Sequence, residues 1–404
     1  MILTKIKHQF NNERIQDEEI DGIIREEYSK AKPDVKNGAE IAIAVGSRGI
    51  YKIDQMVKTL VACVKESGGK PFIVPAMGSH GGATAEGQIE VLASYNITEE
   101  SVGAPVKSSM EVVELPNGGL KNKVYMDKNA FEADGTIVIN RVKVHTAFHG
   151  EIESGLLKML VIGLGKHQGA LQVHAMGPEG LKKVIPETGK QILKKGNIIF
   201  GLAIVENANE KTARIKGVSN EDFYDEEKKL LHWSRKNMPR LPVDQLDVLL
   251  IDEFGKDISG TGMDIHMIGR MHIKHQPEPK SPVITSIVVF DLTEASHGNA
   301  NGMGLADVIT RRLYDKIDFK STYANVLTTG FLERGMMPVV AETEKEAIHF
   351  ALKQCYLNDV AAARIIRIKN TLALDEIWVS PAVLDEIKDM DQIEVMDETS
   401  VLPI

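Results

Sequence analysis

The segment that first suggests chemistry spans residues 142–174, "VKVHTAFHGEIESGLLKMLVIGLGKHQGALQVH". It holds four of the chain's 12 histidines, two glutamates, and Lys158 among apolar and glycine residues. Histidine and glutamate serve as metal ligands and as general acids and bases. The order His-Glu-x-x-His of zinc proteases does not occur. Lys158 either extends its ammonium group to the surface, or is desolvated, with a lowered pKa that makes it nucleophilic.

Two earlier turns offer further polar groups beside small residues. In "VGSRGI", Arg48 could bind a carboxylate or phosphate with two parallel hydrogen bonds. In "AMGSHGGAT", the small neighbours of His80 leave its ring accessible and let backbone N–H groups approach an anion. A surface arginine and a solvent-facing turn histidine are the plain alternatives. Neither turn has the glycine spacing of a P-loop or a dinucleotide-binding motif.

The spacing of the histidines in 142–174 leaves several sites open. His145 and His149 are four residues apart and would share a face of a helix. The preceding strand and Gly150 argue against a helix there. His167 and His174 follow on a segment whose periodicity is ambiguous.

Strands and helices are predicted to alternate through the first half of the chain. Apolar runs and helical spacing predict strands at 39–47, 123–127, 133–145 and 198–207, a strand followed by a glycine-rich turn within 70–82, and helices at 54–69, 84–97 and 220–238. This alternation predicts an α/β fold with a mostly parallel sheet covered by helices on both faces. Ligands of such sheets bind beyond the carboxyl ends of the strands. The turns "GSRG", "GSHGG" and "NRVKVH" all fall there.

The second half repeats the α/β pattern after a proline-containing linker at 239–245. Strands are predicted at 246–253, 281–292 and 363–370, helices at 302–315 and 343–356, and a glycine-rich loop at 254–264. At 404 residues the chain exceeds the usual size of one core. We therefore expect two domains, 1–240 for cofactor binding and catalysis and 241–404 closing a cleft that holds the active site.

Composition narrows the class of protein. The net charge of −9 and the lack of a basic block argue against a nucleic-acid partner. Two cysteines allow no disulfide framework. Because the first residues lack a signal-peptide pattern and no apolar run approaches about 20 residues, we expect a cytoplasmic protein without a membrane partner, acting on a small molecule.

Taken together and in order, these motifs resemble the nickel-pincer nucleotide-dependent lactate racemase family, whose members racemise or epimerise 2-hydroxy acids. The resemblance rests on "GSRG" with Arg48, "GSHGG" with His80, the strand end with His145, "SGLLK" with Lys158, and His174 one helix further on. In the second domain, "GKDISGTGMDIHMIGR" (255–270) is similar to the family's glycine-rich loop.

The resemblance implies a cofactor and a role for each residue. The cofactor is a pyridinium-derived mononucleotide whose two thio-acid arms hold a nickel ion, and it is attached covalently to a lysine, here Lys158. His174 would be the nickel ligand, a normal role for imidazole. His80 and His145 would act as alternating general bases while hydride moves from Cα to the cofactor and back, and Arg48 would hold the substrate carboxylate.

The resemblance also implies further cofactor contacts and partners. The nucleotide would rest on polar groups and glycine-rich turns that comprise Ser47, Gly78, Gly81, Ser154, Gly155 and Asp264. The protein would depend on cofactor-biosynthesis proteins, and its substrate would be a small 2-hydroxy acid.

Departures from the family pattern bear on the substrate. Family members often carry Asp at the position of Val45 and Arg at that of Gly81, and the usual Asp-x-Asn becomes "DIH" at 264–266. The stretch between His145 and Lys158 is longer than usual. These changes predict an acid longer or more polar than lactate, such as a sugar-derived acid.

They also leave alternatives open. His149 competes with His145 as the base, and His167 competes with His174 as the nickel ligand. A metal-dependent lyase or hydrolase would instead use His80, His145 or His149 together with Glu151 or Glu153. A non-catalytic sugar-acid binding protein on the same scaffold is the third reading.

Overall fold

A computed structural model describes residues 1–47, 49–145 and 148–404, so that Arg48 lies outside the described residues. The chain forms two compact units. One is Asn11–Met238, and the other combines Met1–Phe10 with Pro239–Ile404. The first ten residues, which the sequence pattern places with the N-terminal domain, thus belong to the unit formed by the C-terminal part.

The unit Asn11–Met238 is built on a five-stranded sheet in the order β3-β2-β6-β7-β8. The strands are β2 (Glu40–Val45), β3 (Lys70–Pro75), β6 (Gly135–Arg141), β7 (Ile198–Glu206) and β8 (Thr212–Val218). The first four are parallel, and β8 pairs antiparallel with β7. The predicted mostly parallel sheet is confirmed.

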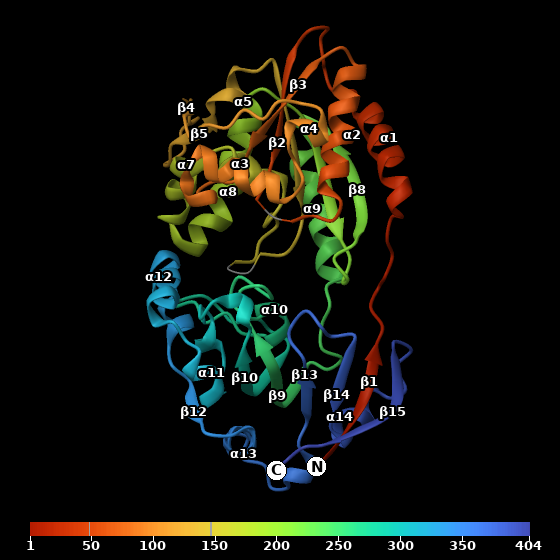
Figure 1. Ribbon diagram of the computed structural model, residues 1–404, viewed down its shortest axis with the longest axis vertical. Coiled ribbons are helices and arrows are strands. Elements are labelled where there is room, and N and C mark those ends of the chain that lie inside the picture. The colour runs from red at the N-terminus through yellow and green to blue at the C-terminus, as the bar shows by residue number, and fades with distance from the viewer. Residues whose placement is uncertain (48, 146–147) are drawn as a thin grey trace. The chain divides into compact units, whose positions relative to one another are not determined.

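Both faces of this sheet are covered, because alternate residues of each strand enter separate cores. In β2, Ile41 and Ile43 pack into the core formed with α1 (Ile20–Ala31) and α2 (Ile53–Glu66). Ala42 and Ala44 face the core formed with α6 (Leu156–Lys158), α8 (Gly177–Lys195) and α9 (Phe223–Lys236). In Figure 1, α1 and α2 run side by side.

The helices of this unit are α1 (Ile20–Ala31), α2 (Ile53–Glu66), α3 (Ala85–Ser94), α4 (Glu99–Val102), α5 (Lys128–Glu132), α6 (Leu156–Lys158), α7 (Lys166–His174), α8 (Gly177–Lys195) and α9 (Phe223–Lys236). A π-helix, Met159–Gly163, links α6 to the turn before α7.

The strand predicted at 123–127 exists, but it does not join the parallel sheet. As β5 (Val124–Asp127) it pairs antiparallel with β4 (Val112–Leu115) in a separate two-stranded sheet. The sequence pattern alone cannot choose between these partners, since strand propensity says nothing about which edge a strand meets.

The second unit holds an eight-stranded sheet in the order β12-β11-β10-β9-β13-β14-β1-β15. Its strands are β1 (Ile2–His8), β9 (Gln245–Phe254), β10 (Val283–Leu292), β11 (Val308–Thr310), β12 (Val339–Ala341), β13 (Ile365–Ile368), β14 (Glu376–Val379) and β15 (Ile393–Val401). Pairing is parallel from β12 to β13 and antiparallel from β13 to β15. The helices are α10 (Ile265–Ile268), α11 (Arg311–Asp315), α12 (Phe319–Thr329), α13 (Glu344–Gln354) and α14 (Pro381–Ile387).

The helix predicted at 302–315 is wrong in its middle. The β-branched run Val308–Thr310 forms β11, in parallel register with β10. Only Arg311–Asp315 is α-helical there. A central position in the sheet overrides the apparent helical spacing, because strand preference depends mainly on cross-strand packing.

Among the helices in the described part of the chain, none has the length and apolar character to cross a membrane.

Candidate functional site

A pocket of about 110 Å³ lies at the carboxyl ends of β2, β3 and β6. Its polar lining consists of Ser47, His80, Asn140, Ser154 and Lys158, and its apolar lining includes Met77, Met159 and Ile162. Ser47 and His80, predicted at two strand ends, therefore meet Lys158 in one place, as expected for a ligand site on a parallel sheet, whereas His145 is not among the residues that line this pocket.

The turn that carries His80 is shaped by glycines and fixed to two other elements. His80 Nδ1 lies 2.5 Å from the hydroxyl oxygen of Ser47. Gly81 has φ +63, and a Cβ there would lie 2.6 Å from the carbonyl carbon of Gly87. Gly78 donates its N–H to the carbonyl of Gly163 at 3.2 Å. The turn thus needs glycine both for its left-handed backbone and for its close packing.

Lys158 ends the short helix α6, and its half-buried side chain lines the pocket. The preceding Gly155 is held from one side by Asn140, whose Nδ2 donates to the Gly155 carbonyl at 2.7 Å. A π-helical turn follows Lys158 directly. Such turns occur frequently at functional sites, because they redirect side chains within a helix.

His174 ends α7 and is not among the residues that line the pocket. His174 is exposed, yet desolvation lowers the pKa of the imidazole, and the positive charge of Lys158 lowers it further. His174 and Lys158 are therefore close enough to interact electrostatically. Its rival His167 is exposed in the first turn of the same helix.

His145 lies in a loop that is organised by the fully buried Glu153. The Glu153 carboxylate accepts the N–H of His145 at 2.6 Å, the N–H of Gly150 at 3.0 Å and Nη2 of Arg235 at 2.7 Å. Nδ1 of His149 lies 3.4 Å from the same carboxylate. Burial alone would raise the pKa of Glu153, but the hydrogen bonds from His149 and the backbone, with the Arg235 charge, hold that pKa below its ordinary value.

The two histidines of this loop differ in their surroundings. The ring of His145 packs on Phe148, with centroids 4.5 Å apart. His149 is 42% exposed and is paired with Glu153. Thr146 and Ala147, which lie between them, are outside the described residues.

The acidic residues of this loop are engaged by helix α9. Glu151 accepts a hydrogen bond from Tyr224 at 2.7 Å and is paired with Lys228. In the described ranges of the chain, no three His, Cys, Asp or Glu side chains are arranged to hold a metal ion. The set of ligands predicted for a metal-dependent lyase or hydrolase is thus not assembled there.

Asp264, predicted to contact the cofactor, belongs to the other unit and has a local role. Its carboxylate caps α10 by accepting the N–H of His266 at 2.8 Å, and its own N–H donates to the hydroxyl of Thr371 at 2.9 Å. The cofactor role of Asp264 stays a prediction, as does the substrate role of Arg48.

Several residues around the pocket have no sequence signal that identifies them. Lys166 is fully buried in an ion pair with Asp127 at 3.2 Å, and it donates to Gln88 at 2.9 Å and to the carbonyl of Pro75. Gln88 in turn donates to the carbonyls of Gly78 and His80. This network connects α7, β5 and α3 to the turn of His80. Asn140 lies near the carboxyl end of a predicted strand. Ligands of parallel sheets bind at such ends, so its position in the sequence gives a partial indication of its role.

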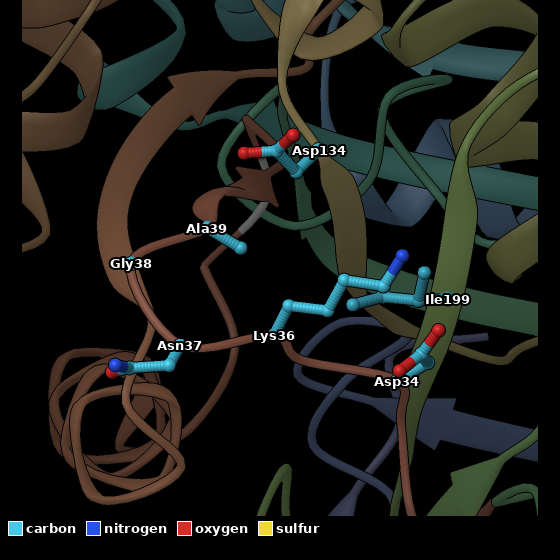
Figure 2. Close-up of a pocket in the computed structure, with 7 residues that line it drawn as sticks. All are labelled: Asp34, Lys36, Asn37, Gly38, Ala39, Asp134 and Ile199. Carbon is cyan, nitrogen blue, oxygen red and sulfur yellow. The ribbon is translucent and has the colours of Figure 1, made fainter.

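A second hollow of about 390 Å³ lies near the amino ends of the strands, which begin at Glu40, Gly135 and Ile198. It is lined by Asp34, Lys36, Asn37, Gly38, Ala39, Asp134 and Ile199. Figure 2 shows the Lys36 side chain extending alongside Ile199. Because ligands of parallel sheets bind at the opposite, carboxyl end, we regard the pocket of Ser47, His80 and Lys158 as the candidate site.

Comparison with known proteins gives a sequence match and a structural one. Residues 48–219 match the profile of a domain of unknown function (DUF362). No protein with a curated description matches the chain in sequence. The structure of the lactate racemase apoprotein from Thermoanaerobacterium thermosaccharolyticum superposes with a TM-score of 0.53 at 13% identity, covering 92% of this chain and 99% of that chain. The two chains therefore share the two-domain α/β fold.

Proposed function

We propose that the protein is a racemase or epimerase of a 2-hydroxy acid that works with a nickel-pincer nucleotide attached to Lys158. One observation carries the proposal: Ser47, His80 and Lys158, which are far apart in the sequence, line a single pocket at the carboxyl ends of parallel strands. The fold shared with a lactate racemase apoprotein supports the same reading.

The residues present fit such a cofactor. The Lys158 side chain reaches the pocket and supplies an amine for a covalent bond. A metal ligand must be a neutral imidazole, and the lowered pKa of His174 favours that form. When bound, the cofactor would accept a hydride from the substrate and return it. His174 is therefore proposed as the nickel ligand.

The chain's own residues would manage the hydroxyl proton of the substrate. His80 is suited to both directions of transfer, because histidine titrates near neutral pH. A hydroxyl can donate and accept, so Ser47 can hold the His80 ring in either protonation state. We propose His145 as the second base, the role that the resemblance gives to the histidine at this strand end, with His149, which is paired with Glu153, as the alternative.

The substrate is proposed to be longer or more polar than lactate. The stretch between His145 and Lys158, whose length departs from the family pattern, carries polar groups just before Ser154, and Ser154 itself lines the pocket. A sugar-derived 2-hydroxy acid would use such groups as hydrogen-bond partners. The pocket's own polar side chains, Asn140 and Ser154, could serve hydroxyl groups in the same way.

The test is to produce the protein together with cofactor-biosynthesis proteins and to analyse it by peptide mass spectrometry and nickel quantitation. We expect a mass increase on the peptide that carries Lys158, one nickel per loaded chain, and epimerisation in a screen of 2-hydroxy and aldonic acids. Lys158→Arg, which keeps the charge but offers no equivalent amine, is the matched control and should stay unmodified. An unmodified Lys158 without nickel in the unsubstituted protein would overturn the proposal.

A further inference from the structure

Helix α9 carries a carboxyl group on its buried face that the proposed chemistry does not use. The buried residues of this helix are Phe223, Glu227, Leu231 and Ser234, at the spacing of a single helical stripe. Glu227 is completely buried. A carboxyl group in such a stripe is costly unless hydrogen bonds stabilise it, so its contacts indicate what it does.

Those contacts are the free N–H groups at the start of α6, the helix that carries Lys158. The Oε2 atom of Glu227 accepts the N–H of Leu157 at 2.8 Å, and the N–H of Leu156 also bonds to this carboxyl group. The residue before the helix is Gly155, which has no side chain to cap it. Glu227 therefore takes the place of a local N-cap from a different helix.

Gly155 is required by this arrangement for reasons of space alone. Its φ of −179 is an extended conformation that any residue can adopt. A Cβ at this position would, however, lie 2.4 Å from the Cδ and Oε1 atoms of Glu227. The glycine of the "SGLLK" motif thus gives the carboxyl group access to the backbone.

The backbone before Lys158 is consequently held on two sides. On one side, Asn140, which lines the pocket, donates to the carbonyl of Gly155. On the other, Glu227 accepts the next free N–H groups. Burial raises the pKa of Glu227 to about 7 even though the N–H groups of Leu157 and Leu156 oppose the rise. Its Oε1 atom has no hydrogen-bond partner among the described residues.

We propose that Glu227 is a positioning residue for Lys158: it fixes the first turn of α6 so that the Lys158 amine is held in the pocket for covalent attachment of the cofactor. This inference rests on the proposed function, since it assigns Glu227 to the attachment step. Glu227 does not itself contact the substrate in this assignment, and it acts only through the backbone of Leu156 and Leu157.

Two conservative variants separate the effect of the length of the Glu227 side chain from the effect of its ionisable carboxyl group. Glu227→Gln keeps an oxygen at the same distance, so we expect the fraction of Lys158 carrying the cofactor to stay within twofold of the unsubstituted protein. Glu227→Asp keeps the carboxyl group but withdraws it from Leu157, and should lower that fraction at least fivefold. Asp225→Asn, an exposed position on the same helix, is the control and should load normally.

Hydrogen exchange of the protein without cofactor supplies a second readout. The amides of Leu156 and Leu157 should exchange at least tenfold faster in Glu227→Asp than in Glu227→Gln, while those of β2 are unchanged. If Glu227→Asp folds and loads Lys158 as well as the unsubstituted protein does, the inference is overturned and the proposed function stands. If the unsubstituted protein is never modified at Lys158, the proposed function fails instead.

Discussion

At the scale of single residues, the candidate site depends on polar groups whose surroundings set their protonation. Burial raises the pKa of Glu227 to about 7, whereas hydrogen bonds hold that of Glu153 below its ordinary value. The difference follows from the number of donors. Glu153 has a charged arginine and several N–H groups around it, whereas the donors to Glu227 in the described part of the chain are two backbone N–H groups.

Glu227 should make stability depend on pH in an unusual direction. Its folded pKa of about 7 lies above the ordinary 4.5, so the folded protein retains a proton that the unfolded chain releases. Stability is therefore lost as pH rises from about 5 to 8. Relative to the unsubstituted protein, the free energy of unfolding of Glu227→Gln should rise by about 2.5 kcal/mol between pH 5 and pH 8. Urea unfolding at both values measures this, and a constant difference would contradict it.

Loss of the contact between Ser47 and His80 should lower kcat and leave substrate binding, as measured by KM, little changed. Ser47→Ala removes the hydrogen bond that orients the His80 ring. A bond of about 1.4 kcal/mol corresponds to a loss of about tenfold in kcat, with KM little changed. Steady-state kinetics on the best acid from the screen measure this, with exposed Ser79→Ala as the control. Equal kcat in both variants would show that the contact is unimportant.

At the scale of elements, helix α9 and the Lys166 network hold the segments that carry the predicted site residues. Helix α9 provides Arg235 to the loop of His145 and Glu227 to the helix of Lys158. Lys166, at the start of α7, joins β5 and α3. These contacts connect segments that are distant in the sequence.

Arg235→Met should loosen the loop of His145. It leaves the buried Glu153 without its charged donor, and we expect a loss of roughly 1.5–3 kcal/mol in the free energy of unfolding. Hydrogen exchange at the amides of His145 and Gly150 should accelerate. The neighbouring exposed Lys236→Met is the control and should change neither quantity. Unchanged protection of His145 would show that Arg235 does not stabilise this loop.

Lys166→Met should be much more damaging, because it leaves the Asp127 carboxylate buried without its cation. Breaking a buried pair by removing one partner typically costs about 3–5 kcal/mol. The double variant Lys166→Met with Asp127→Asn should recover part of that loss, since no buried charge is then left unpaired. Urea unfolding of the single and double variants completes the cycle. A double variant no more stable than Lys166→Met would refute the coupling.

At the scale of the whole molecule, the chain begins and ends in the same unit. Strand β1 lies between β14 and β15, and Leu402 donates its N–H to the carbonyl of Met1 at 2.8 Å. The unit Asn11–Met238 is thus inserted between β1 and the remaining strands of the other unit.

Deleting residues 2–8 should therefore destabilise the unit that contains Pro239–Ile404 and spare the unit Asn11–Met238. Removing β1 leaves β14 and β15 without the strand that joins them. We expect hydrogen exchange to accelerate at least tenfold at the amides of β14 and β15 and to stay unchanged in β2 and β6. Equal acceleration in both units would mean that they unfold together.

The sequence by itself determined the α/β class and placed Ser47 and His80 at strand ends, which the pocket brings together. Apolar runs with fixed period specify strands and helices locally, and parallel strands bring their carboxyl ends to one edge. Only the tertiary structure decided that β1 joins the distant unit and that Val308–Thr310 is a strand. It also selected Glu227 and Arg235 as partners of the site. These choices depend on packing between segments far apart in the chain, and local periodicity carries no information about such pairings.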